Sequence, residues 1–126
     1  MTKRKRKTEK QKCFDRCENL WKEICLKRAG YKSEISGKNN NLVVHHIARK
    51  PNYALRFSTE NGIVLTGYEH YRGIHGEREE EYREKIKAAK GQNIYERMNK
   101  LRHISSPNIF EIEQGLLREL ERISEF

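Results

Sequence analysis

The sequence has no long hydrophobic run. Across its 126 residues no apolar stretch approaches the roughly 18 residues needed to span a bilayer. Its N-terminal residues are charged and lack the apolar segment of a signal peptide. These two absences predict a soluble intracellular protein with no membrane partner.

Cysteine is also scarce. The three cysteines, Cys13, Cys17 and Cys25, are odd in number and spaced by four and eight residues, which does not suit a disulfide framework. With Phe14 and Trp21 they recur at three- and four-residue steps, which predicts a helix with one buried face that ends at Gly30. We interpret the thiols as small core residues. Metal ligation is the less favoured alternative, because no fourth ligand lies nearby in the sequence.

Acidic residues are outnumbered by basic ones, 18 to 27, for a net charge of +9. Residues 1–12 hold seven Lys or Arg and one Glu, which leaves only +3 for the rest. We expect residues 1–12 to form a flexible basic arm that binds DNA, because such a run releases counterions when it meets a polyanion. A solvated tail and a localisation signal are the alternatives. The candidate contacts in the arm are Lys3, Arg4, Lys5, Arg6 and Lys7.

The remaining chain alternates short apolar runs with turn-forming residues. Residues 42–44 lead into a histidine pair and predict a strand, and residues 63–65, after Asn61-Gly62, predict its antiparallel partner. Residues 68–74 predict a short helix. The segments 78–90 and 92–104, and a last one behind Ser106-Pro107, also read as helices. The expected fold class is α+β, with a long N-terminal helix and additional C-terminal helices.

Four of the five histidines fall between residues 45 and 75. Hydrolysis of a phosphodiester needs a water nucleophile, a group that takes its proton, and a cation that neutralises developing charge. Neutral imidazole can accept the proton, and further histidines can hold a divalent metal. A regular strand would point His45 and His46 to opposite faces. We therefore expect the strand to bend there, turning His45 to the metal and His46 to the water.

Four segments of the chain resemble the HNH endonuclease family, also called ββα-metal or His-Me finger nucleases, and particularly its phage members. They are Leu-Val-Val-His-His-Ile, Leu-Arg-Phe, Glu-Asn-Gly-Ile-Val-Leu and Glu-His-Tyr-Arg-Gly-Ile-His-Gly, within about residues 20–76. The resemblance implies a ββα-metal (HNH) motif in which two strands and a helix hold one divalent cation. It also implies single-metal hydrolysis of DNA that leaves a 5′-phosphate. Residues 13–76 would form the nuclease core, and residues 77–126 a helical extension that packs on the core or forms a homodimer.

The family's site residues carry over by position. His45 matches the first metal ligand and His46 the general base. Asn61 matches the asparagine that orients the base and its loop, and His70 the ligand on the helix. The cofactor implied is one divalent ion, Mg²⁺ or Mn²⁺ by cellular supply, whereas histidine ligands would also accept Ni²⁺, Co²⁺ or Zn²⁺.

His75 fits the family pattern less closely. In relatives with a third histidine ligand that residue lies four positions after the second, but His75 follows His70 by five. On a regular α-helix it would point about 140° away from His70. Either Gly73 ends the helix and restores the geometry, or Asn61 or water completes the coordination sphere.

A second departure concerns the structural zinc that braces many HNH proteins through two Cys-x-x-Cys pairs. The matching positions here are Ser33, Ser36, Thr66 and Glu69, so all four thiolates are missing. We expect no structural zinc. Apolar packing must then hold the fold, and we expect the first and last helices to clamp the ββα unit.

Cationic residues flank the histidines and could bind the phosphates on either side of the cut. They are Arg49, Lys50, Arg56 and Arg72. Arg56 is equally a candidate for a buried hydrogen-bonding role, because Leu55 and Phe57 are expected to anchor their loop in the core.

DNA is therefore the expected partner, and hydrolysis of its phosphodiester bonds, by nicking or double-strand cutting, is the expected activity. Two alternatives remain: a structure-selective nuclease of branched DNA, and a DNA-binding protein on an HNH scaffold that has lost catalysis. The intact His46 argues against the second. A phage-encoded member would act in the bacterial cytoplasm, with phage packaging or recombination proteins as candidate partners.

Overall fold

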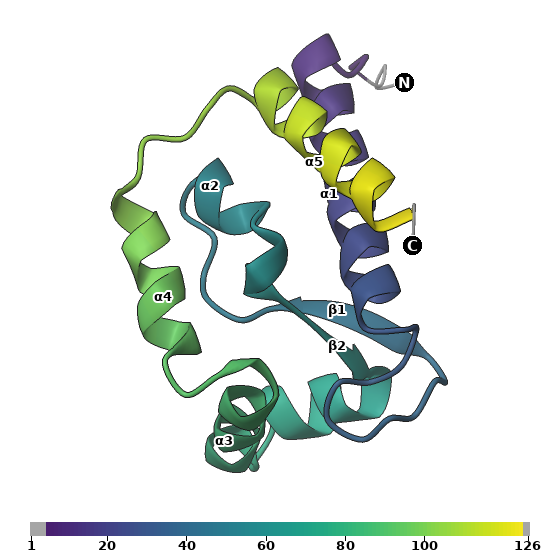
Figure 1. Ribbon diagram of the computed structural model, residues 1–126, viewed down its shortest axis with the longest axis vertical. Coiled ribbons are helices and arrows are strands. Elements are labelled where there is room, and N and C mark those ends of the chain that lie inside the picture. The colour runs from purple at the N-terminus through teal and green to yellow at the C-terminus, as the bar shows by residue number, and fades with distance from the viewer. Residues whose placement is uncertain (1–4, 125–126) are drawn as a thin grey trace.

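Helices surround a two-stranded antiparallel sheet in the computed structural model, which describes residues 5–124 (Figure 1). The predicted α+β class, with a long N-terminal helix and further C-terminal helices, is confirmed. Lys3 and Arg4 lie outside the described residues. The elements are α1 (Glu9–Arg28), β1 (Leu42–His46), α2 (Tyr53–Arg56), η1 (Thr59–Asn61), β2 (Gly62–Thr66), η2 (Glu69–Ile74), α3 (Glu79–Lys90), α4 (Ile94–Lys100), η3 (Leu101–His103) and α5 (Ile109–Ser124).

Helix α1 begins at Glu9, so the last residues of the predicted flexible arm are helical. The cause is a capping box at Thr8. Its hydroxyl accepts a hydrogen bond from Gln11 N at 3.1 Å, and the Gln11 side chain accepts one from Thr8 N at 2.8 Å. Glu9 in the first turn adds a favourable charge at the positive end of the helix. The arm prediction therefore extended one turn too far into the chain.

The sheet lies directly against α1. Strands β1 and β2 pair antiparallel with His45 opposite Ile63 and His46 opposite Gly62. A Cβ on Gly62 would lie 2.6 Å from Cys25 Sγ and 2.9 Å from Trp21 Cζ2, closer than side chains can pack. The glycine after Asn61 is therefore required by the close approach of α1 to β2. Its φ of −116° is ordinary extended backbone and not a turn conformation.

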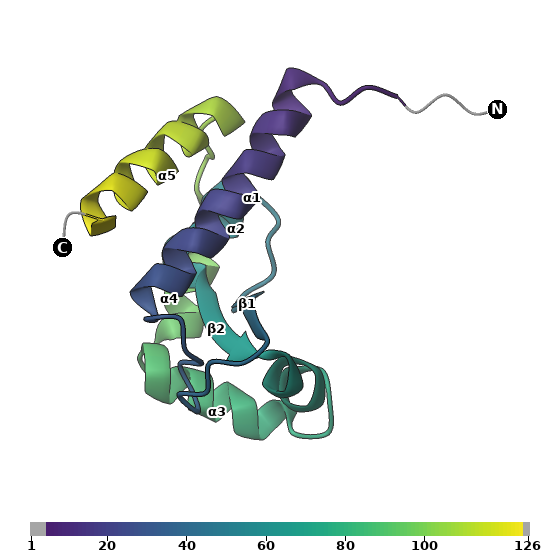
Figure 2. The ribbon, with the colours of Figure 1, turned by 90° about the vertical axis from the view of Figure 1, so that its right-hand side faces the viewer.

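Helix α1 packs side by side with α5 (Figure 2). Cys13 and Cys17 are fully buried in this interface together with Ile109 and Leu116. Burial raises the pKa of Cys17 and of Cys25 to about 12, which keeps these thiols neutral among the apolar side chains of the core. The interpretation of the cysteines as core residues is confirmed.

The first and last helices were expected to clamp the ββα unit, but they cover only one face of the sheet. Residues of α1, α5 and β2 share one apolar cluster around Trp21 and Val64. The opposite face of the sheet, with Ile63 and Leu65, packs against Ile86 of α3 and against α4. A two-stranded sheet has two apolar faces to cover, so the helices after β2 are needed as much as the terminal pair. Within residues 5–124, no helix is long and apolar enough to cross a membrane.

Candidate metal centre and cleft

Three histidines converge from two elements that are adjacent in space. His45 lies in β1, His70 lies in η2, and His75 is the residue that caps the C-terminal end of η2. Their nearest ligand atoms all lie within 4.8 Å of one another, and the Nε2 atoms of His70 and His75 are 3.2 Å apart. The structure therefore brings together the three positions named as metal ligands.

His75 reaches this cluster because η2 is a π-helix. Its widened turn closes with a backbone hydrogen bond from His75 N to His70 O at 3.3 Å. In this i to i+5 arrangement, residues five apart lie over one another, which an α-helix does not allow. Gly73 lies inside η2 and does not end it. The prediction that Gly73 ends the helix and so brings His75 into position is wrong. The wider π-helical turn accommodates the five-residue step from His70 to His75 instead.

The spacing and chemistry of the three imidazoles suit a divalent cation. Nitrogen ligands bind zinc at about 2.0–2.1 Å, which places two ligand nitrogens on one ion roughly 3–3.4 Å apart. The His70–His75 pair already has that separation. Burial, helped by the neighbouring histidines, lowers the pKa of His45 to about 4, and burial also lowers the pKa of His70. Both rings are therefore neutral at cellular pH, the protonation state that metals require.

His46 lies on the other face of β1. The strand stays regular through both histidines, so the predicted bend is wrong. The imidazole of His46 stacks on the Trp21 indole with ring centroids 4.1 Å apart and an interplanar angle of 9°. The stacking on Trp21 and the pairing with β2 keep β1 a regular strand through His46. His45 and His46 nonetheless line one cleft of about 950 Å³, at the edge where β1 ends.

A backbone carbonyl sets the tautomer of His46. Its Nε2 lies 3.0 Å from Arg56 O, and because a carbonyl only accepts, Nε2 carries the proton. Nδ1 is then the nitrogen with a free lone pair. Burial lowers the pKa of His46 to about 4, although the hydrogen bond to Arg56 O acts in the opposite direction. His46 is therefore a neutral, oriented proton acceptor.

Asn61 holds helix α2, which carries this carbonyl, against the start of the loop after β1. It is fully buried; its Oδ1 accepts from Ala48 N at 2.8 Å, and its Nδ2 donates to Leu55 O at 3.0 Å and to Ala48 O at 3.3 Å. These bonds tie Ala48, in the loop after β1, to Leu55 of α2. Since α2 also presents Arg56 O to His46, Asn61 positions His46 indirectly. The Asn61 amide is fully engaged by Ala48 and Leu55, which argues against the alternative in which Asn61 coordinates the metal.

Replacing Asn61 by alanine is expected to lower the free energy of unfolding by about 2–5 kcal/mol. Ala48 N–H would lose the partner that it has in the structure, at about 1–3 kcal/mol for an unsatisfied group, and Leu55 O and Ala48 O would each lose one hydrogen bond, at about 1 kcal/mol each. Urea denaturation followed by circular dichroism measures the change. Asn99→Ala, at an exposed position of α4, is the matched control and should unfold near the wild-type midpoint. Equal midpoints for the two variants would contradict this role of Asn61.

The predicted DNA-contacting cations are distributed unevenly. Arg49 and Lys50 are exposed and line the cleft. Arg72 is exposed on η2 and is not among the residues that line it. Arg56 pairs with Glu18, and its guanidinium lies 4.7 Å from the Phe14 ring centroid, which favours the structural alternative for that residue. Lys5, Arg6 and Lys7 are exposed before α1, at the end of the helix remote from the sheet (Figure 2).

Other residues in the cleft wall were missed by the sequence reasoning. Arg83 and Glu79 come from α3, Tyr95 from α4 and Arg102 from η3. They lie after the segment that resembles HNH proteins, on helices whose charges look like ordinary solvated surface. No spacing rule relates them to the histidines, so only the packing of the C-terminal helices could have revealed them.

The four positions where the resemblance would place zinc-binding cysteines do gather in space. The Glu69 carboxylate accepts from Thr66 N at 2.8 Å, and Glu69 N donates to Thr66 Oγ1 at 3.1 Å. Burial raises the pKa of Glu69, but this backbone bond and the hydroxyls of Ser33, Thr66 and Ser36 together bring it below its ordinary value. A hydrogen-bonded carboxylate thus anchors the start of η2, one residue before His70.

Comparison with protein families, with curated proteins and with solved structures finds no match to this chain. The histidine cluster and its cleft are therefore the features that bear on function.

Proposed function

We propose that the protein is a metal-dependent HNH-type endonuclease that hydrolyses phosphodiester bonds in DNA, with His46 accepting a proton from the attacking water. The observation that carries the proposal is the meeting of two kinds of histidine at one cleft. Three imidazoles lie with ligand atoms within 4.8 Å of one another, and a fourth is neutral and held by a carbonyl. In this proposal β1, β2 and η2 form the ββα-metal motif.

His45, His70 and His75 would hold one divalent cation. When bound, the ion supplies charge stabilisation at the phosphoryl and leaving oxygens. A set of three imidazoles suits Mn²⁺, Co²⁺, Ni²⁺ or Zn²⁺ better than Mg²⁺, because Mg²⁺ prefers oxygen ligands. Of the two ions favoured by cellular supply, Mn²⁺ therefore fits this site better.

His46 supplies the base. Its Nδ1 lone pair takes the proton from water, and the imidazolium that forms keeps its Nε2–H bonded to Arg56 O, which stabilises the positive ring. The stacked Trp21 indole limits rotation of the imidazole, and Asn61 keeps α2, which carries the Arg56 carbonyl, in place. These contacts orient the base before substrate arrives. Such pre-organisation is what makes a general base effective.

The cleft also has the charge expected for a polyanionic substrate. Four cations line it, against the single carboxylate of Glu79. Arg49 and Lys50 are exposed at its mouth, where they can contact backbone phosphates independently of sequence. DNA is therefore the substrate class that this proposal names.

Relaxation of supercoiled plasmid tests the proposal. Purified protein is incubated with the plasmid in Mg²⁺, Mn²⁺, Ni²⁺, Zn²⁺ or EDTA, and DNA binding is followed in parallel by gel shift. Nicked or linear product is expected with at least Mn²⁺, none in EDTA, and recovery on return of the ion, because the three histidines need a cation to act.

Each other outcome has a definite meaning. Cutting confined to a four-way junction would identify the structure-selective nuclease. DNA binding without cutting of plasmid or junction in any of these ions would contradict the nuclease and favour the DNA-binding protein on an HNH scaffold that has lost catalysis.

A further inference from the structure

The wall of the cleft formed by the C-terminal helices carries two cations, Arg83 of α3 and Arg102 of η3. Both line the same cleft as His45 and His46. Neither belongs to the segment that resembles HNH proteins, so any role they have is additional to the histidine site.

Arg102 is a half-buried guanidinium without a protein partner among residues 5–124. Its Nε is buried and makes no hydrogen bond. Arg56 and Arg97 also have a buried Nε without a partner, but each forms an ion pair, with Glu18 and Glu60 respectively. Removing a charge from water without pairing it is unfavourable. An anion entering the cleft would supply the missing partner.

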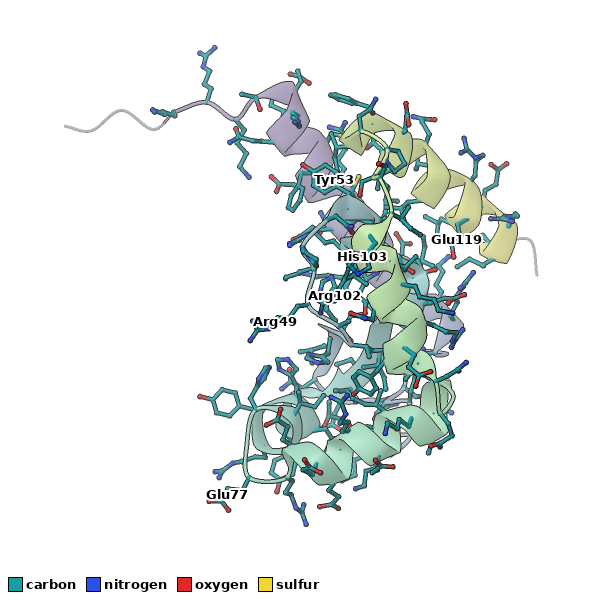
Figure 3. The ribbon with its side chains drawn as sticks, turned by 90° about the vertical axis from the view of Figure 1, so that its left-hand side faces the viewer. Arg49, Tyr53, Glu77, Arg102, His103 and Glu119 are labelled. Carbon is teal, nitrogen blue, oxygen red and sulfur yellow. The ribbon has the colours of Figure 1, made fainter. Side chains whose placement is uncertain are left out.

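The backbone around Arg102 is fixed against the loop that carries Arg49 and Lys50. The Asn52 amide donates to the carbonyl oxygens of Leu101 at 2.9 Å and Arg102 at 3.1 Å. Arg49 and Arg102, both labelled in Figure 3, line the same cleft. Since the backbone of η3 is anchored before any ligand binds, little backbone conformational entropy is lost when Arg102 engages one.

Arg83 is also oriented in advance. Its guanidinium carbon lies 3.9 Å from the centroid of the Tyr95 ring, a cation–π contact that leaves the edge of the guanidinium free for hydrogen bonds. Glu79 is the one carboxylate in the cleft, and it disfavours a phosphate near the start of α3. The cations outnumber it, so the cleft as a whole attracts anions.

We propose that Arg102, supported by Arg83, binds a DNA backbone phosphate next to the one cut at the histidines. This inference rests on the proposed function and extends its substrate site to the C-terminal helices. Arginine suits the role because its planar fork of N–H donors matches two phosphate oxygens at once. Residues 77–126 would then complete the substrate site as well as the core.

Fluorescence anisotropy with a short labelled DNA duplex tests this, using the full chain in EDTA over a range of salt concentrations. Arg102→Gln is expected to weaken binding about tenfold and to reduce the slope of log affinity against log salt by about 0.9, the loss of one phosphate contact. Arg102→Lys should keep the slope and recover only part of the affinity, because the charge remains while the fork is lost. Arg118→Gln, exposed on α5, removes the same charge elsewhere and should bind like wild type.

The outcomes separate this inference from the proposed function. If Arg102→Gln and Arg118→Gln bind equally, the phosphate site at Arg102 is overturned, and metal-dependent plasmid cutting by the wild type would leave the nuclease standing. If the wild type binds no DNA at any salt concentration and cuts none with metal, both fall together.

Discussion

His46→Ala is expected to lower the rate of DNA hydrolysis by about 10²–10⁴-fold, the usual contribution of a general base. Metal affinity should change little, because His46 lies on the face of β1 opposite the three-histidine cluster. DNA affinity should also change little, because His46 is neutral and adds no positive charge to the cleft. Single-turnover cleavage of a labelled duplex in Mn²⁺ measures the rate. Anisotropy with the same duplex measures binding.

The control for this loss is His103→Ala. His103 is exposed on η3, labelled in Figure 3, and is not among the residues that line the cleft. His46→Ala also removes a ring that stacks on Trp21, so its melting temperature must be compared with that of the wild type. A folded His46→Ala protein that cuts at the wild-type rate would sink the assignment of His46 as the base.

His70→Ala is expected to weaken binding of Mn²⁺ or Ni²⁺ by about 100-fold or more. Mutating a residue that merely orients a ligand costs about 10–100-fold in metal affinity, so loss of a ligand itself should cost at least as much. His70 is the central ligand of the three, and its Nε2 lies 3.2 Å from Nε2 of His75. Isothermal titration calorimetry gives the affinity directly. Thermal stability gives it independently, because an ion at about 100 times its Kd adds about 2.7 kcal/mol to the folded state.

His75→Ala tests the π-helical geometry in the same titration. If η2 carries His75 over His70, this variant should also lose most of its metal affinity. His103→Ala again serves as the control. Metal binding by His75→Ala at wild-type strength would show instead that two histidines and solvent suffice.

Much of the fold could be predicted because its causes are local. The apolar period of residues 13–25 produces α1, the runs at 42–44 and 63–65 produce the strand pair, and Asn61-Gly62 marks the start of β2. Gly30 follows the helix end, as expected of a residue with φ of +66°. Each of these signals acts over a few residues, so it can be read without knowing what packs on it.

The site was harder to predict, for two reasons. The candidate ligands could be named by position, but the orientation of His75 depends on a turn type that spacing does not specify. The side of β1 that His46 occupies was decided by Trp21, which lies 25 residues earlier in the chain. The prediction of a bend at His45–His46 was wrong because it did not include Trp21, whose stacking on His46 keeps the strand regular.

The sequence by itself determined which groups are available: histidines clustered within thirty-odd residues, a buried-face helix, and an excess of positive charge. Tertiary structure alone decided how they combine. The π-helical turn of η2 brings three imidazoles together. Packing also places Arg56 O within hydrogen-bonding distance of His46 and pairs Glu18 with Arg56. The C-terminal helices bring Arg83 and Arg102 to the cleft. The physical reason is one of range. Helix and strand patterns follow from neighbours in the chain, whereas the position of a ligand or cation follows from packing between segments distant in sequence.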